Sequence, residues 1–373
     1  MNPAAPMNPA APADAVPPEN RAAPGNRATP AEELLTVRDL RVGFRRHGRP
    51  VPAVRGLSFD VAAGEVLAVV GESGAGKSLT ALALLGLTPP GAEVGGSVRL
   101  RGRELVDAPR SVWREVRGRR ISLVPQDALA VLSPVHTVGE QIAAAVRSVR
   151  RVSRSEAWSR AVAALEQVGI ADAARRARAH PHEFSGGMRQ RAVIAMAMVN
   201  EPELVVADEP TTALDAALQA QLLDTLTQAR QRTGAALLLV THDLGIVAGH
   251  ADRVLIMYAG RHMEDGPVRR VLTEPRTPYT AGLLASLPPE RSTTRRLAAI
   301  PGSPPTAREL LAGGDGCAFA PRCPLAEERC AGTAPPAVAT ERTDHRAACH
   351  RWPELAALGP TLFTDEPAEV PRA

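Results

Sequence analysis

The chain has 373 residues, which is enough for two or three domains at roughly 100–200 residues each. Hydrophobic residues make up 45% of it and charged residues 23%, yet no apolar run approaches the ~18–20 residues that span a bilayer, so we expect no membrane-spanning segment. The net charge of +4 is spread along the chain, which argues against a nucleic-acid partner.

Residues 1–33 predict a disordered tail, because a stretch dominated by Pro and Ala buries too little apolar surface to offset the entropy of ordering it. The stretch lacks the apolar centre of a secretory signal. We therefore expect the chain to remain in the cytoplasm, where its cysteines stay reduced.

Three strands are predicted next. Apolar residues largely alternate over residues 35–44 and again over residues 54–61, which is typical of half-buried strands. Val66–Val70 is a short continuous apolar run, as in a strand buried on both faces. It leads directly into a glycine-rich loop and then an Ala- and Leu-rich helix, and this order is the context in which such a loop binds phosphate.

The glycine-rich loop fits the pattern G-x-x-x-x-G-K-[ST] in full. Its glycines let backbone amides close around phosphate oxygens, Lys77 can reach the β- and γ-phosphates, and the Ser78 hydroxyl can bind Mg²⁺. The predicted phosphate site therefore consists of Gly71, Glu72, Ser73, Gly74, Ala75, Gly76, Lys77 and Ser78.

The following residues, up to about 270, alternate between helical and strand patterns. Residues 127–185 are predicted to be mainly helical. Strands that alternate with helices predict an α/β fold with a largely parallel sheet. The predicted strands are residues 204–207, 236–241 and 254–258, and the helical segments between them lie near residues 188–199 and 214–230.

Polar residues follow the predicted strand at residues 204–207. Asp208 would emerge at the carboxyl edge of the sheet, where α/β sheets bind ligands, and can hold Mg²⁺ through water. Glu209 is then placed to polarise an attacking water. Ser185-Gly186-Gly187 opens a predicted helix whose free amides form an anion site. Each motif alone is also typical of a helix cap, and the phosphate loop upstream favours the functional interpretation.

The order of these motifs resembles an ATP-binding subunit of the ABC transporters over about residues 34–270. The resemblance implies a P-loop NTPase core of the RecA-like type, with a mostly parallel sheet and an inserted helical subdomain at about residues 127–195. It also implies that the protein binds ATP with Mg²⁺ and hydrolyses it. The matching motifs are the phosphate loop, Gln126, the Ser-Gly-Gly signature, Asp208-Glu209, Leu214-Asp215 and His242.

The resemblance implies a role for each matching residue. Glu209 is the catalytic base, His242 is a switch on the γ-phosphate, and Asp215 belongs to the D-loop. Mg²⁺ is held through Ser78, Gln126 and Asp208, and Gln126, in the Q-loop, also couples the site to membrane subunits. The signature, which acts in trans on the nucleotide of the opposing subunit, consists of Ser185, Gly186, Gly187 and Met188. Phe44 stands where an aromatic ring stacks on adenine, although one Phe in a strand is equally typical of a core.

Four short segments narrow the resemblance to the D-type ATPase of oligopeptide and dipeptide importers: residues 138–141, 181–191, 277–280 and 300–302. This implies a small, irregular, Cys-containing C-terminal domain over residues 271–355 and a loose tail over residues 356–373. It implies a peripheral protein at the cytoplasmic face of the membrane that powers uptake of di- or oligopeptides. The expected partners are a second homologous ATPase, forming a heterodimer, two integral-membrane permeases and an extracytoplasmic peptide-binding protein.

The alternative is a soluble, non-transport ABC ATPase that acts on ribosomes or DNA. DNA-repair members insert long coiled coils between the phosphate loop and the signature. Here Ser185 follows Lys77 by only 108 positions, with no heptad run between them. Ribosome-acting members usually carry two ATPase cassettes in one chain, and this chain has one. Both observations favour transport.

The four cysteines are spaced C-x₅-C-x₆-C-x₁₈-C in one Pro-rich segment. Thiols gathered in a reducing compartment suggest a metal site rather than disulfides. Zinc sites usually use C-x₂₋₄-C pairs, so the spacing favours a [4Fe–4S] cluster, with Zn²⁺ and unliganded cysteines as alternatives. Arg322 is placed beside Cys323 to offset part of the cluster charge. The candidate ligands are Cys317, Cys323, Cys330 and Cys349.

Overall fold

Two β-sheets organise the part of the chain that the computed structural model describes, which is residues 32–46, 49–127, 131–211, 216–287, 299–312, 314–358 and 362–363. The described residues all belong to one compact unit that begins at Glu32. The predicted tail at residues 1–33 lies outside the described residues except for its last two. Most of the predicted tail at residues 356–373 lies outside them as well.

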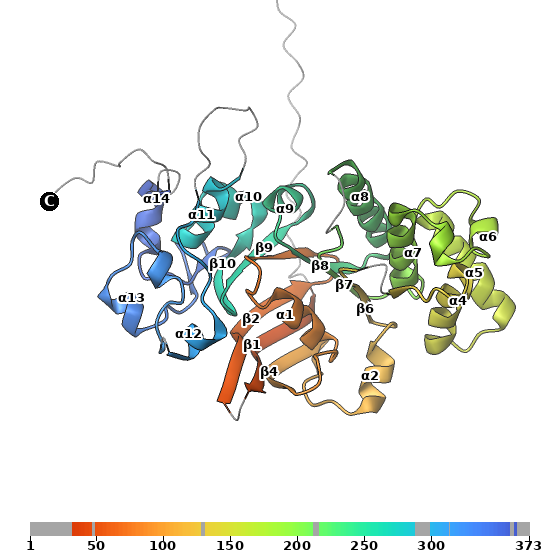
Figure 1. Cartoon of the computed structure of the whole chain (residues 1–373), viewed down its shortest axis with the longest axis horizontal. Helices are drawn as coiled ribbons and strands as arrows, with labels where there is room; N and C mark the ends of the chain where they lie inside the picture. The colour runs from red at the N-terminus through yellow and green to blue at the C-terminus, as the bar shows by residue number, and fades with distance from the viewer. Residues whose placement is uncertain are drawn as a thin grey trace, which may run out of the picture. The chain divides into compact units, whose positions relative to one another are not determined.

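The smaller sheet is antiparallel, in the strand order β2-β1-β4-β5, and Figure 1 shows β2, β1 and β4 side by side. It consists of β1 (Glu33–Arg46), β2 (Arg49–Ala62), β4 (Ala92–Leu100) and β5 (Arg103–Glu104). β1 and β2 confirm the two predicted half-buried strands. The alternation in β1 breaks between Val37 and Leu40, where the pairing register shifts and Asp39 adopts a φ of 48°. Such a bulge adds a residue to one strand, so apolar side chains before and after it still face the core.

The larger sheet carries the strands that meet at the candidate site. Its order is β11-β12-β10-β9-β3-β8-β7-β6, and the strands from β9 to β6 run parallel. These parallel strands are β3 (Val66–Val70), β6 (Ile121–Val124), β7 (Leu204–Asp208), β8 (Ala236–Thr241) and β9 (Arg253–Tyr258). Every residue of β3, β7 and β8 is buried, which matches their continuous apolar sequences and confirms the predicted largely parallel sheet.

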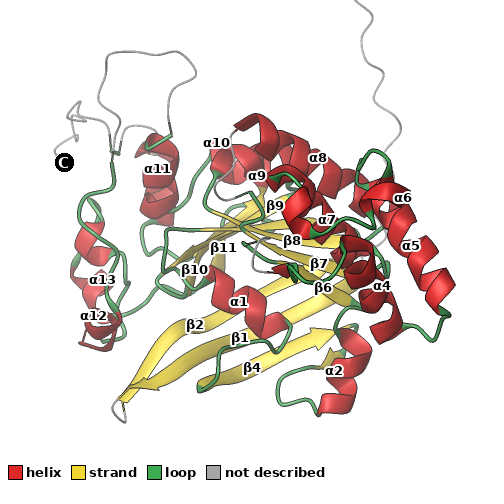
Figure 2. Cartoon of the chain, turned by 45° about the vertical axis from the view of Figure 1, so that its right-hand side comes forward, coloured by secondary structure: helices red, strands yellow, loops and turns green. Residues whose placement is uncertain are grey.

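Helices pack against the larger sheet and also form a separate cluster of their own (Figure 2). Helices α4 to α7 contact one another and confirm the predicted helical insertion. Among the described residues, no helix is both long and apolar enough to cross a bilayer. The helices described up to β9 include α1 (Lys77–Leu84), α2 (Arg110–Val116), α4 (Val138–Val149), α5 (Arg154–Gln167), α6 (Ala173–Arg176), η1 (Pro181–Glu183), α7 (Gly186–Met198), α8 (Ala216–Thr233) and α9 (Leu244–His250).

After β10 (Arg261–Pro267) the chain forms only short elements in its described part. These are α10 (Val268–Thr273), α11 (Pro278–Ala285), α12 (Ala307–Ala312), η2 (Ala320–Arg322), α13 (Glu328–Gly332), β11 (Val338–Ala339), β12 (Arg346–Ala347), η3 (Trp352–Glu354) and α14 (Leu355–Leu358). β12 pairs antiparallel with β10, and Ala347 lies opposite Glu264. The C-terminal region therefore continues the larger sheet, while the predicted domain boundaries at residues 271 and 355 stay predictions.

Candidate functional site

The glycine-rich loop joins β3 to α1, and its backbone passes very close to neighbouring segments. A Cβ atom on Gly71 would lie 2.2 Å from the carbonyl oxygen of Met257, and one on Gly76 would lie 2.7 Å from that of Ala53. Gly76 also has a φ of 93°, which residues with side chains rarely adopt. Glycine is therefore required at both positions, and the loop can present its amides at the start of α1, where backbone N–H groups bind anions.

Lys77 is held at this loop by the backbone of the loop itself. Its side chain is 5% exposed, and Nζ donates to the carbonyl oxygens of Gly71 at 2.8 Å and Glu72 at 3.2 Å. Nζ also lies 3.8 Å from Oε1 of Glu209. Burial lowers the pKa of Lys77, and the carboxylates of Glu209 and Asp208 act against this effect. A buried ammonium group in this position favours an anionic ligand.

Ser78 and Asp208 place two oxygen atoms side by side. Ser78 Oγ, in the first turn of α1, donates to Oδ1 of Asp208, the last residue of β7, over 3.0 Å. Burial raises the pKa of Asp208, and the hydrogen bond from Ser78 acts against this effect. Hydroxyl and carboxylate oxygens are ligands that Mg²⁺ prefers, so the pair fits the predicted Mg²⁺ site.

Glu209 lies where predicted site residues from different strands meet. Its Oε2 is 3.5 Å from Nε2 of Gln126, which follows β6, and 3.5 Å from Nδ1 of His242, which follows β8. Glu209 has a φ of 44°, and its amide donates to the carbonyl oxygen of Val240 at 2.9 Å. This conformation is uncommon for a residue with a side chain, and such local strain clusters at functional sites.

These segments enclose a cavity of about 660 Å³ beside the glycine-rich loop. It is lined by the whole loop, residues 71–78, together with Gln126, Glu209 and His242, so the structure brings these predicted residues together. Ala53 and Leu283 also line it, and sequence reasoning missed both. Leu283 lies on α11, more than 200 residues after the loop in sequence, and no local pattern points to it.

Phe44 and Asp215 are predicted site residues that the structure does not place at this cavity. Phe44 is not among the described residues that line it. Phe44 lies on β1 opposite Val51 and Ala92, and its stacking on adenine stays a prediction. Asp215, the predicted D-loop residue, lies outside the described residues.

The Ser-Gly-Gly signature begins α7 and does not line the cavity in the described part of the chain. Ser185 is the N-cap of α7, and its Oγ accepts a hydrogen bond from the Met188 amide at 3.3 Å. A Cβ atom on Gly186 would meet open space, whereas one on Gly187 would meet the side chain of Leu218. Because the signature does not line the cavity of its own phosphate loop, its position is compatible with action on the nucleotide of an opposing subunit. That action in trans stays a prediction.

All four cysteines line a second, much smaller cavity of about 20 Å³. None is in a disulfide, and burial raises the pKa of the Cys323 thiol to about 11 and that of Cys349 to about 12. Within the described ranges, however, no group of three or more His, Cys, Asp or Glu side chains is placed to hold a metal ion. The cysteines share one cavity without forming such a group in this structure, and the predicted [4Fe–4S] cluster is not confirmed.

Arg322 directs its charge away from the cysteines, in contrast to the prediction. Nη1 and Nη2 pair with the two carboxylate oxygens of Glu72, at 2.7 and 3.1 Å, in the glycine-rich loop. The cationic residue that lines the cysteine cavity is instead Arg351, whose amide donates to Sγ of Cys349 at 3.4 Å. Sequence reasoning missed both contacts. The partner of Arg322 is distant in sequence, and no local pattern shows how residues 317–351 fold.

Comparison with known proteins agrees with this geometry. Residues 54–212 match the family described as ABC transporter, and residues 263–330 match the C-terminal region of the oligopeptide/dipeptide transporter family. The chain is 45% identical over 306 residues to the oligopeptide transport ATP-binding protein OppD of Salmonella typhimurium, which covers 82% of this chain and 90% of that protein.

Two mycobacterial relatives are longer than this chain. The proteins of the same name in Mycobacterium tuberculosis and Mycobacterium bovis are 52% identical over 320 residues, which is 85% of this chain and 52% of theirs. The chain thus spans about half the length of these two relatives.

Solved structures show the same fold. CbiO1 of Clostridium perfringens, part of an ABC transporter complex, has a TM-score of 0.56 at 25% identity and covers 65% of this chain and 92% of that one. A dimeric ATP-binding cassette bound to ADP and Pi has a TM-score of 0.57 at 24% identity and covers 63% of this chain and 99% of that one. The predicted P-loop fold is confirmed.

Proposed function

Since the chain belongs to the ATP-binding subunits of the oligopeptide/dipeptide ABC transporters, we propose that it hydrolyses ATP to power peptide uptake through membrane partners. The observation that carries this proposal is the convergence of Lys77, the Ser78–Asp208 pair and Glu209 beside the glycine-rich loop. The relatives are named for oligopeptide transport, which gives no support to the alternative of an ATPase acting on ribosomes or DNA.

The residues around the cavity have different roles in ATP hydrolysis. The loop amides and Lys77 bind the β- and γ-phosphates, and His242 contacts the γ-phosphate. Ser78, Asp208 and Gln126 hold Mg²⁺, which supplies Lewis-acid stabilisation of the phosphoryl oxygens when bound. Glu209 orients the attacking water and accepts its proton. The 3.5 Å contacts from Gln126 and His242 to Glu209 support this division, because they tie the base to both neighbours.

The proposal includes a partner ATPase. Ser185, Gly186, Gly187 and Met188 complete the nucleotide site of the opposing subunit, and Asp215 belongs to the D-loop. A second, homologous ATPase is the proposed opposing subunit, and two integral-membrane permeases and an extracytoplasmic peptide-binding protein complete the importer. This assembly places the chain at the cytoplasmic face of the membrane. The dimeric form of the solved cassette described above supports the pairing of two ATPase subunits.

Ser185→Arg tests the trans arrangement. We expect ATP hydrolysis by the assembled complex to fall by about tenfold or more, because the larger cation blocks the partner's γ-phosphate site. MgATP binding to the isolated chain should stay at the wild-type level, which a fluorescent ATP analogue can measure. Thermal unfolding is recorded in parallel because Ser185 also caps α7.

Ser155→Arg, on the exposed surface of α5, is the matched control and should change neither quantity. If the isolated Ser185→Arg chain loses as much nucleotide affinity as a chain without Lys77, the signature acts on its own site and the trans assignment is wrong.

We also propose that the four cysteines hold a [4Fe–4S] cluster with a structural role. Their shared position on one cavity and their free thiols support the proposal. Burial raises the pKa values of the Cys323 and Cys349 thiols, so an iron centre would be needed to favour their thiolate forms. No step of ATP hydrolysis passes through this group.

Chemical analysis of anaerobically purified protein tests the cluster. We expect about four iron and four sulfide per chain, brown protein, and loss of both elements in Cys323→Ser. One zinc per chain without iron would establish the zinc alternative, and protein with neither metal would establish unliganded cysteines.

A further inference from the structure

The glycine-rich loop is bound by a residue from the far end of the chain. Glu72, in the loop, accepts two hydrogen bonds from Arg322, which lies 250 positions later. The Arg322 side chain is 7% exposed and that of Glu72 is 24% exposed, so the ion pair is largely shielded from water. Two parallel bonds to one carboxylate fix orientation as well as distance. We infer that Arg322 positions the glycine-rich loop for nucleotide binding through this pair with Glu72.

Aromatic side chains reinforce the contact. Nη1 of Arg322 also donates to Oη of Tyr258 at 3.2 Å, and its guanidinium lies 5.7 Å from the centre of that ring and 5.9 Å from that of Phe319. The backbone amide of Glu72 donates to Oη of Tyr279 at 3.0 Å. Tyr258, Tyr279 and Phe319 contact one another, with ring centres 4.7 to 5.3 Å apart. Both the side chain and the backbone of Glu72 are thus fixed by C-terminal residues.

The position of Arg322 depends on the cysteine segment, which we define as residues 314–358. Arg322 ends the turn η2 between Cys317 and Cys323. The Ala320 amide donates to the carbonyl oxygen of Cys317 at 3.0 Å, and the Cys323 amide donates to that of Ala320 at 3.2 Å. Both cysteines line the cysteine cavity, so a rearrangement there would move Arg322 and the glycine-rich loop with it.

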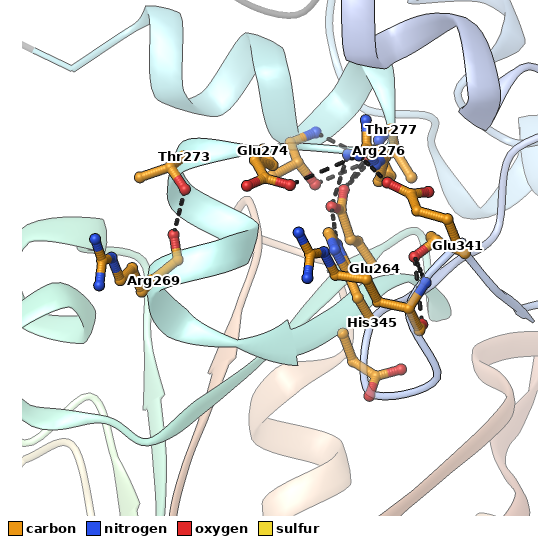
Figure 3. Close-up of polar contacts among 12 residues, drawn as sticks. Glu264, Arg269, Thr273, Glu274, Arg276, Thr277, Glu341 and His345 are labelled. Carbon is orange, nitrogen blue, oxygen red and sulfur yellow. Dashed lines mark hydrogen bonds and ion pairs between the residues drawn. The ribbon is translucent and has the colours of Figure 1, made fainter.

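The cysteine segment has a second, separate attachment to the core (Figure 3). Glu264 on β10 is fully buried and accepts hydrogen bonds from the Arg276 amide at 2.7 Å, from the Thr277 amide and hydroxyl at 3.0 Å, and from Nε2 of His345 at 2.8 Å. The Ala348 amide also donates to the carbonyl oxygen of Met263 at 2.7 Å. Because these bonds do not involve Arg322, a variant of Arg322 should keep the segment attached.

Loss of Arg322 would leave the Glu72 carboxylate without its cationic partner at the wall of the 660 Å³ cavity. The phosphates of a nucleotide are negatively charged, and a partly buried like charge nearby repels them. The loop would also be freer to move before binding, and ordering it again weakens affinity. Both effects lower nucleotide affinity, and both act through the ion pair of Arg322 with Glu72.

A double-mutant cycle on the full chain, with a fluorescent ATP analogue and Mg²⁺ as the probe, separates these effects from general destabilisation. Arg322→Met is expected to weaken binding about tenfold, which corresponds to 1.4 kcal/mol. In the background of Glu72→Gln the same substitution should change affinity by no more than about twofold, because the ion pair through which Arg322 acts is already lost. Amide hydrogen exchange in residues 71–78 should be faster in Arg322→Met.

The controls make each outcome decisive. Arg329→Met removes an exposed cation of the same segment, paired with Glu327, and should bind like wild type. Equal nucleotide affinity of Arg322→Met and wild type would overturn the inference. An equal loss of affinity on Arg322→Met in the wild-type and Glu72→Gln backgrounds would also overturn it, because such a loss indicates a structural effect that does not depend on Glu72. The inference rests on the proposed function. A wild-type chain that binds no nucleotide would contradict that function itself, whereas normal binding by wild type and Arg322→Met overturns only the role of Arg322.

Discussion

Replacing Lys77 with Ala is expected to lower the affinity of the chain for MgATP by about a hundredfold or more. Lys77 is the buried cation of the cavity, its Nζ is fixed by the carbonyl oxygens of Gly71 and Glu72, and charge-assisted hydrogen bonds to phosphate are among the strong ones. The variant also leaves Glu209 and Asp208 without a nearby ammonium group, so the site becomes more negative. Titration of a fluorescent ATP analogue measures the loss.

A chemical measurement on the wild-type protein checks the same contact independently. Lys77 is the only lysine of the chain, so an amine-reactive reagent can modify only its side chain and the α-amino group. MgATP should protect Lys77 and leave the α-amino group reactive, which intact-mass analysis resolves. Arg154→Ala, at the exposed start of α5, is the control for loss of a cation and should bind normally. Unchanged affinity in Lys77→Ala would remove Lys77 from the phosphate site.

Replacing Glu209 with Gln is expected to reduce ATP hydrolysis by about 10²–10⁴-fold while MgATP binding is retained. The substitution keeps the size of the side chain and its hydrogen bonds but removes the group that accepts the proton of water. Lys77 and Ser78, which contact the ground-state nucleotide and its metal, are unaffected. The assembled complex should therefore stay closed with ATP bound, which is measured as stoichiometric ATP retained after gel filtration.

Glu203→Gln is the matched control, since Glu203 precedes β7 at its opposite end and pairs with Arg101 and Arg120. It should hydrolyse ATP at the wild-type rate. Normal turnover by Glu209→Gln would show that another group is the base. Loss of ATP binding would show that Glu209 contributes mainly to binding of the nucleotide and not to activation of the attacking water.

The parts of this molecule that the sequence predicts correctly are those with local patterns. β3, β7 and β8 are continuous apolar runs because both faces are buried, and the phosphate loop requires glycine where its backbone meets Met257 and Ala53. The convergence of Glu209 and His242 was also predictable, since each follows a parallel strand and such strands end at one edge of the sheet.

The parts of the fold that the sequence does not predict depend on contacts between residues that are distant along the chain. β10 has the sequence Arg-His-Met-Glu-Asp-Gly-Pro, which no strand pattern fits, and yet it is buried because Glu264 is satisfied by residues 12 to 81 positions away. β6 has only four residues, too few for a periodic pattern to identify. The pair of Glu72 and Arg322 spans 250 positions. A single sequence carries no signal for such contacts, so the link between the cysteine segment and the nucleotide site emerges only from the structure.

Purification of the tagged chain from detergent-solubilised membranes, followed by mass spectrometry and an ATPase assay of the recovered complex, tests whether the chain powers a membrane importer. We expect recovery of two integral-membrane subunits and a second homologous ATPase, with MgATP hydrolysis that Glu209→Gln in this chain strongly reduces. Recovery of the chain with ribosomes or DNA, and without any integral-membrane protein, would contradict it.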